Sequence, residues 1–112
     1  MSFSVKLYQV LDDLDIDGFK NLFHEDFVYV DNYEMMTSDD YIALLRKQWT
    51  ETPIDFSRDR NTLVDSRDIF SFQFTRDIEG VPHRITNVSL LTEGKFWRSQ
   101  IHRVPVLSLI HI

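Results

Sequence analysis

Asp31 ends the stretch EDFVYVDNYE (residues 25–34), on the same side of an alternating pattern as the aromatic residues Phe27 and Tyr29. Two valines alternate with them, so the pattern predicts a strand whose aromatic side finishes in a carboxylate. A carboxylate at the mouth of an aromatic pocket is partly desolvated, which raises its pKa and its basicity. Such a group can take a proton from a carbon next to a carbonyl, or from water. Asp31 is therefore a candidate general base.

The same residue also has a structural interpretation. Asp31 and Asn32 form a dipeptide that commonly begins a turn, because short polar side chains hydrogen-bond to nearby backbone groups. In that case the carboxylate only marks where the strand meets water. The residue types alone leave both interpretations open.

Three helices are expected around the Asp31 strand. Apolar residues recur at helical spacing over residues 3–13, and a shorter helix follows Asp15, which is suited to cap it. A third helix begins at Thr37 or Ser38. It ends at Pro53, because the residue before a proline resists the helical region.

The second half of the chain has the alternation of strands. The apolar period changes to two from residue 57, and Glu79-Gly80 and Glu93-Gly94 are suited to tight turns. Together with the helices this predicts one α+β domain over residues 1–106, with helices on one face of a curved antiparallel sheet. The expected strands are residues 27–31, 57–66, 69–78, 84–91 and 96–104.

Composition excludes several classes of partner. The chain has 112 residues, enough for one small domain, and a formal net charge of −6 without a basic run, so a nucleic acid partner is not expected. It has no cysteine, which excludes disulfides and thiolate chemistry. No apolar run has the length of a membrane span, and no signal-peptide pattern opens the sequence, so we expect a cytoplasmic protein without membrane contact.

The last six residues, LSLIHI (residues 107–112), match the translation of a transposon-adapter sequence used in preparing DNA libraries. We therefore expect a metagenomic reading frame that ran into an adapter, with a non-native tail after Val106. The alternative is a last apolar strand at a sheet edge or in a dimer. His111 is accordingly left out of the functional candidates.

Three features in order carry a family resemblance: LDIDGFKNLFHEDFVYVDN (residues 14–32), a capped helix, and a meander ending in TEGKFWRSQIHRV (residues 92–104). Over residues 5–104 this order resembles the nuclear transport factor 2-like superfamily. The nearest branch is the SnoaL-like one, which includes polyketide cyclases and ketosteroid isomerases. The resemblance implies a cone-shaped curved antiparallel sheet wrapped around N-terminal helices. It also implies an apolar pocket at the open end and homodimers formed through the outer face of the sheet.

The resemblance also implies catalytic positions. In the ketosteroid isomerase pattern the carboxylate at the end of the first strand is the general base, and Asp31 occupies that position without a gap from Asp15. The pattern supplies an oxyanion hole from a first-helix tyrosine and a protonated late-strand aspartate. Tyr8 lies one residue from the tyrosine position, which Leu7 occupies. The aspartate has no match here, and Asn87 is the nearest polar residue.

Strand register decides which residues line the pocket. A two-residue loop at Glu93-Gly94 pairs Leu90 with Trp97, and apolar content then favours the side that includes Trp97 as the concave face. A bulge would reverse this and bring Asn87 and His102 inside. The expected substrate-binding residues are Tyr29, Met35, Met36, Phe72, Phe74, Trp97, Ser99, Ile101 and Arg103.

Two of these expectations have alternatives. Met35 and Met36 are expected in a loop before the third helix, either as a pliable lid or in ordinary packing. Arg103 or Arg84 is expected in or near the pocket, where it would bind a substrate carboxylate or pair with Asp31. The alternative for either arginine is a position at the rim, in water.

Two functions from different classes follow. The first is an enzyme without metal or cofactor, an isomerase, lyase or hydrolase that uses Asp31 on a small hydrophobic carbonyl compound. The second is a non-catalytic module of the same fold that binds a ligand or dimerises. The chain offers no His or Cys spacing for zinc, so no metal is expected.

Overall fold

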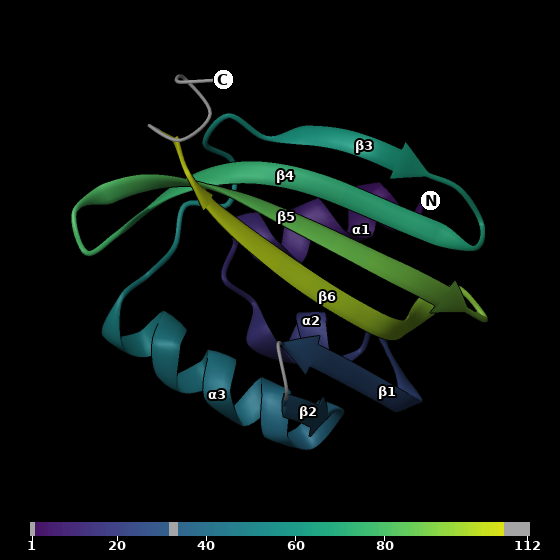
Figure 1. Cartoon of the computed structure of the whole chain (residues 1–112). Helices are drawn as coiled ribbons and strands as arrows, with labels where there is room; N and C mark the ends of the chain where they lie inside the picture. Colours follow the sequence, from purple (N-terminus) through teal and green to yellow (C-terminus); the bar gives the residue numbers. More distant parts are fainter. Residues whose placement is uncertain (1, 32–33, 107–112) are drawn as a thin grey trace.

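The computed structural model describes residues 2–31 and 34–106, except for the side chain of Asp31. Within these residues the chain forms three helices and six strands (Figure 1). The turn proposed at Asn32 and the tail proposed at residues 107–112 lie outside the described residues. The elements are α1 (Phe3–Asp12), α2 (Ile16–Lys20), β1 (Phe23–Asp31), β2 (Glu34–Thr37), α3 (Ser38–Glu51), β3 (Asn61–Asp65), β4 (Ile69–Ile78), β5 (Val81–Thr92) and β6 (Lys95–Pro105).

The six described strands form one curved sheet in the order β2-β1-β6-β5-β4-β3. In Figure 1, α1 and α2 lie behind this sheet and α3 runs beside β1 and β2. The α+β class and the curved sheet with N-terminal helices are confirmed. The sheet is not wholly antiparallel, however, because β1 pairs with β6 in parallel. The helix α3 lies between β1 and the meander in sequence, so β1 can pair with β6 in the same direction.

The expected helix caps are present. The side chain of Asp15 accepts a hydrogen bond from the backbone N–H of Gly18, and Thr37 accepts one from Asp40 in the same way. Each bond satisfies a donor that the first helical turn leaves unpaired. These two caps fix where α2 and α3 begin.

Both expected hairpin turns have the geometry that their sequence requires. Glu79 and Gly80 have φ of 53° and 80°, and Glu93 and Gly94 have φ of 57° and 72°. Two consecutive positive φ values define the turn type whose twist matches that of paired strands, and glycine adopts the second without strain. The meander β4-β5-β6 is therefore set by local sequence.

The core lies between the helices and the concave face of the sheet. Phe70, Phe72 and Phe74 of β4 are buried on this face, as alternation predicts. Leu7 and Leu11 of α1 are buried against the same core. This aromatic packing makes the concave face of the sheet the buried one.

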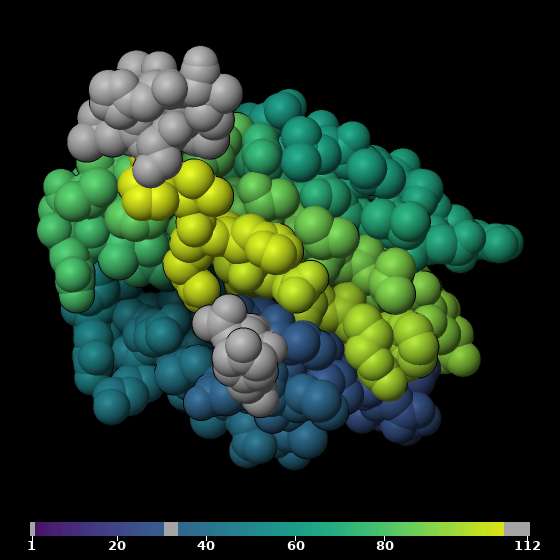
Figure 2. All heavy atoms as spheres, in the orientation of Figure 1, coloured from purple at the N-terminus to yellow at the C-terminus, as the bar shows by residue number. Residues whose placement is uncertain are grey.

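The outer face is more polar, but it also carries exposed apolar residues. Figure 2 shows the side of the molecule away from α1, with β6 crossing it diagonally. Arg84 lies on this face, where its guanidinium donates to Thr75 and Gln73, so the expectation that Arg84 reaches the pocket is wrong. Val88 and Leu90 are 39% and 43% exposed.

A bulge at Trp97 changes the expected register of β5 and β6. Leu91 pairs with Phe96 as the two-residue loop requires, but Leu90 pairs with Arg98 rather than with Trp97. The extra residue lets Leu91 and Phe96 be buried while the inward side of β6 continues as Ser99, Ile101 and Arg103. Asn87 pairs with Ile101 and faces inward, whereas His102 is exposed.

Met35 and Met36 are in a strand, not in the expected loop. They belong to β2, which pairs with β1 antiparallel, with Val30 opposite Met35 and Tyr29 opposite Met36. Met35 is 74% exposed, and Met36 packs partly buried against the core. The pairing gives this segment a backbone partner that its own sequence does not reveal.

Candidate functional site

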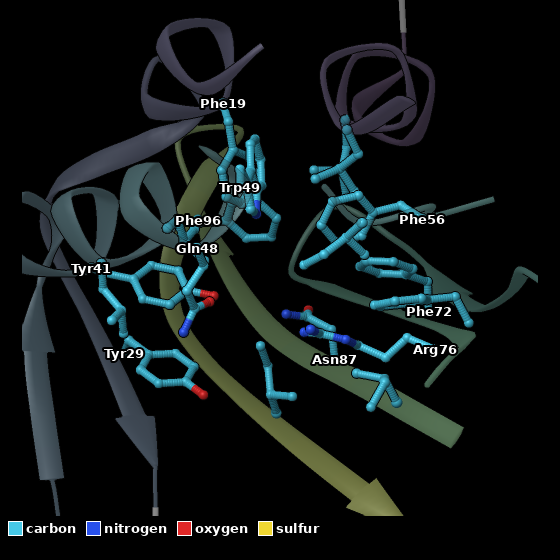
Figure 3. Close-up of a pocket in the computed structure, with 18 of the residues that line it drawn as sticks. Phe19, Tyr29, Tyr41, Gln48, Trp49, Phe56, Phe72, Arg76, Asn87 and Phe96 are labelled. Carbon is cyan, nitrogen blue, oxygen red and sulfur yellow. The ribbon is translucent and has the colours of Figure 1, made fainter. Parts of the chain in front are cut away.

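A cavity of about 400 Å³ lies between the concave face of the sheet and the helices. Figure 3 shows Tyr29, Tyr41 and Gln48 on one side of it, with Phe72, Arg76 and Asn87 on the other. Its inner lining is mostly aromatic and aliphatic, and a few polar groups interrupt it. The lining residues are Leu7, Leu11, Phe19, Tyr29, Glu34, Met36, Tyr41, Leu44, Leu45, Gln48, Trp49, Ile54, Phe56, Phe72, Phe74, Arg76, Ile85, Asn87, Phe96, Ile101 and Arg103.

Asn87 is held in the cavity wall by a chain of two serines. Ser89 Oγ donates a 2.7 Å hydrogen bond to Oδ1 of Asn87, and it also lies 2.7 Å from Oγ of Ser99. Because Ser89 has one hydroxyl proton and gives it to Asn87, Ser99 is the donor in the second bond. Within the described residues, Nδ2 of Asn87 has no protein partner. Its two N–H groups remain available to a ligand.

Two arginines form the cationic part of the lining. Arg76 follows Phe74 by two residues in β4 and is half-buried, and Arg103 comes from β6. Burial lowers the pKa of the Arg76 guanidinium, and the nearby positive charge of Arg103 lowers it further. An arginine still remains protonated at neutral pH. The cavity therefore holds two like charges close to an apolar wall.

Trp49 contributes a second unusual polar group. Its indole Nε1 is buried, and it is the one buried side-chain donor or acceptor in the described ranges that has no hydrogen-bond partner. The ring stacks on Phe19 and meets Phe56 edge to face. An unpaired buried donor costs free energy, so the ring contacts of Trp49 offset that cost at this end of the cavity.

Solved structures identify this architecture. No protein-family model matches the sequence, and no curated protein sequence matches it either. A nuclear transport factor 2-like protein of unknown function from Burkholderia xenovorans superposes with a TM-score of 0.68 at 12% identity, over 92% of this chain and 80% of that one. The chain has the nuclear transport factor 2-like fold.

Two further structures with this fold have names that concern chemistry. IdmH, a proposed polyketide cyclase from Streptomyces antibioticus, has a TM-score of 0.64 at 12% identity, over 98% of this chain and 96% of that one. A proposed ketosteroid isomerase from Kribbella flavida has a TM-score of 0.63 at 15% identity, over 90% and 74%. At such identities the likeness establishes the nuclear transport factor 2-like fold alone.

The cavity is lined by part of the expected substrate-binding set. Met35 is exposed on β2, and Trp97 lies at the bulge, where the guanidinium of Arg98 stacks 3.9 Å from its ring centroid. Ser99 is buried behind the wall and contacts Ser89. These three do not line the cavity. The expected residues that do line it are Tyr29, Met36, Phe72, Phe74, Ile101 and Arg103.

Of the expected catalytic residues, Asn87 lines the cavity and Tyr8 does not. The hydroxyl of Tyr8 shares a hydrogen bond with Thr62 of β3, and Arg60 covers the Tyr8 ring at 4.0 Å from its centroid. The neighbouring residue on α1, Leu7, faces the cavity instead. The helix therefore presents a methyl-bearing side chain where the isomerase pattern has a tyrosine.

The backbone of Asp31 ends β1 opposite Glu34 of β2. Its side chain lies outside the described residues, so its expected role stays a prediction. Tyr29, two positions earlier in β1, lines the cavity, and so does Glu34. Asp31 thus belongs to the strand end that borders the cavity.

Sequence reasoning missed Arg76, Gln48 and Trp49 as lining residues. For Arg76 the signal was available, because the alternation of Phe72 and Phe74 continues to position 76 in the same strand. Gln48 and Trp49 lie seven and eight residues after Tyr41 on α3, so helical spacing places both on the face of α3 that lines the cavity. The signal for this pair was therefore also available.

The described residues offer neither a membrane-spanning helix nor a metal-binding cluster. None of the helices in the described ranges combines the length and apolar character that a membrane crossing requires. Among the same residues, no three His, Asp or Glu side chains gather closely enough to hold a metal ion.

Proposed function

We propose that the protein is a small-molecule enzyme in which Asp31 acts as a general base on a hydrophobic carbonyl compound bound in the cavity. The observation that supports this most directly is the amide of Asn87, fixed by Ser89 with its N–H groups available to a ligand. An oriented donor in an apolar wall is suited to bind a carbonyl oxygen. Asp31 stands at the end of the strand that carries Tyr29.

The proposed chemistry begins with transfer of a proton from the carbon next to the carbonyl to the Asp31 carboxylate. The electron pair of that C–H bond forms the new C–C double bond, and the carbonyl π electrons move to oxygen. Asn87 Nδ2 donates to the resulting enolate oxygen, where negative charge has developed. The Asp31 carboxyl proton exchanges with solvent, and delivery of a solvent-derived proton to the same carbon then gives exchange. Where the enolate is conjugated with a further double bond, delivery to the far carbon of that system gives isomerisation.

Proton exchange tests this without knowledge of the natural substrate. We would incubate the protein in D₂O with three hydrophobic ketones, 1-indanone, 2-tetralone and benzylacetone, and follow deuterium uptake next to the carbonyl by NMR. Wild-type protein is expected to accelerate uptake above the buffer rate for at least one ketone. Asp31→Asn should reduce that acceleration at least about 100-fold, the usual contribution of a general base.

The matched control is Asp26→Asn, which removes the same charge from an exposed position in the same strand. It should exchange at the wild-type rate. Asn87→Ala should reduce exchange about 100-fold, as expected for loss of one oxyanion donor. Equal rates in wild-type protein and Asp31→Asn would remove Asp31 from the mechanism.

The second candidate is a non-catalytic binding module of the same fold, and one observation favours it. Leu7 is fully buried at the position where the isomerase pattern has its tyrosine, so that side of the cavity supplies no hydroxyl donor. A module of this kind would bind the ketones without accelerating deuterium uptake. Ketone binding by calorimetry, together with deuterium uptake at the buffer rate, would favour the binding module over the enzyme.

We also propose a homodimer formed through the outer face of the sheet. Val88, Leu90 and Val104 are partly exposed there, at 39%, 43% and 38%. Burial of such residues between two copies would remove apolar surface from water. A monomeric mass by sedimentation at micromolar concentration would contradict this assembly.

A further inference from the structure

Arg76 is a half-buried cation whose charge no described residue neutralises. It lies on the concave side of β4, and Figure 3 shows its guanidinium extending into the cavity towards Asn87. Within residues 2–31 and 34–106, apart from the Asp31 side chain, no hydrogen bond or ion pair involves the Arg76 side chain. A charge withdrawn from water without a partner is unfavourable, so a ligand that supplies one would gain free energy.

Arg103 strengthens the positive field at the same place. It lines the cavity from β6, and the pKa of Arg76 is lowered first by burial and then by the positive charge of Arg103. Among the described lining residues, Glu34 is the one acid, and it is exposed on β2. The Arg76 guanidinium therefore makes this region of the cavity attractive to an anion.

The remainder of the lining requires an apolar body. Phe72 and Phe74 continue the wall on the same strand as Arg76, and Phe96 and Trp49 close it further in. A guanidinium binds a carboxylate through two parallel hydrogen bonds, a geometry that a neutral amide or ester cannot reproduce. The cavity thus combines an apolar slot with a planar donor for an anion.

We propose that the ligand of this cavity is a hydrophobic carboxylate whose anionic group binds Arg76 while its hydrocarbon body packs on the aromatic wall. This inference rests on the proposed function in placing the ligand in the same cavity. It adds the substrate class: a keto acid rather than a neutral ketone. The carboxylate would anchor at Arg76, and the ketone oxygen would face Asn87.

The test compares 2-naphthoate with 2-naphthamide, two probes of nearly equal shape that differ in charge. We expect wild-type protein to bind the naphthoate at least about ten-fold more tightly by calorimetry at neutral pH and low salt. Arg76→Gln should abolish this preference and leave the affinity for 2-naphthamide within about two-fold. Arg67→Gln is the matched control, because it removes the same charge from a side chain that is 92% exposed.

A second variant keeps the test decisive if Arg76→Gln fails to fold. Arg76→Lys retains the charge but loses the paired donors, so it should keep only part of the preference. Equal binding of the two probes by wild-type protein, or an undiminished preference in a folded Arg76 variant, would overturn the inference. Either result would leave ketone exchange by Asp31 untouched, so the two proposals can fail separately.

Discussion

Ser89 Oγ donates a 2.7 Å hydrogen bond to Oδ1 of Asn87, and the two residues stand two positions apart on the concave side of β5. Ser89 is fully buried, whereas Asn87 is partly open to the cavity. The bond therefore fixes the amide so that its nitrogen, not its oxygen, is presented to a ligand. Ser99 in turn donates to Ser89, so two strands hold one amide.

Replacement of Ser89 tests whether this orientation matters. We expect Ser89→Ala to reduce ketone exchange about five- to thirty-fold, because an amide without its anchor can rotate away from the enolate oxygen. Ketone affinity measured by calorimetry should change much less, since the apolar wall is intact. Ser71→Ala is the matched control, because Ser71 donates 2.8 Å to the backbone oxygen of Asn87 and not to its side chain. A similar loss of exchange in both variants would argue against the orienting role.

Tyr8→Phe should leave exchange within about two-fold of wild type. Its hydroxyl is bonded to Thr62 outside the cavity, so it is not available to a bound carbonyl. The free energy of unfolding should fall by about 0.5–1.5 kcal/mol through loss of that hydrogen bond, as chemical denaturation would measure. Loss of exchange on the scale of Asn87→Ala would instead return Tyr8 to the catalytic set.

The same variant isolates a pH dependence of stability. Burial raises the pKa of Tyr8, so the folded state holds the phenol proton more tightly than the unfolded state does. The resulting stabilisation is complete below the ordinary value of about 10 and is lost as pH rises through the folded pKa. The stability difference between wild type and Tyr8→Phe should therefore shrink above about pH 10. A constant difference from pH 8 to pH 11 would contradict it.

Local signals explain which parts of the fold were predictable. The caps at Asp15 and Thr37, the hairpin turns and the limits of β4 depend on neighbouring residues, and all follow from sequence. The bulge at Trp97 does not, because it arises when Leu91 and Phe96 bury together against helices that are distant in sequence. The pairing of β1 with β6 is also not predictable from local sequence, because the two strands are far apart in the chain.

The candidate site was predictable to the extent that alternation reached it. Phe72 and Phe74 were correctly placed on the concave face, and the same period leads to Arg76. Asn87 was assigned to the opposite face because apolar content alone decided the register. Its environment depends on Ser89 and Ser99, which form a polar contact within the sheet that a hydrophobic pattern cannot reveal.

Trp49→Phe should change the free energy of unfolding by less than about 1 kcal/mol. The variant loses some apolar contact, but it also removes the buried Nε1 donor that has no partner, and the two effects oppose each other. Trp49→Ala should cost about 3–5 kcal/mol, because it removes the ring that stacks on Phe19. Thermal and denaturant unfolding of both variants would measure this. A loss of several kcal/mol in Trp49→Phe would indicate that the indole nitrogen has a partner, such as an internal water.

Ile101→Trp should fill the cavity and separate ligand binding from the rest of the fold. Ile101 lies opposite Asn87 on β6 and lines the cavity, so a larger side chain there would occupy the ligand volume while the aromatic core behind it stays packed. We expect affinity for 2-naphthamide to fall more than about ten-fold and ketone exchange to fall to background, with stability close to wild type or higher, as cavity filling commonly produces. Val5→Trp is the control, since Val5 is 51% exposed on α1 and lines neither the cavity nor the outer face of the sheet. Undiminished binding of 2-naphthamide by a folded Ile101→Trp protein would place the ligand elsewhere and remove this cavity from every proposal made for it.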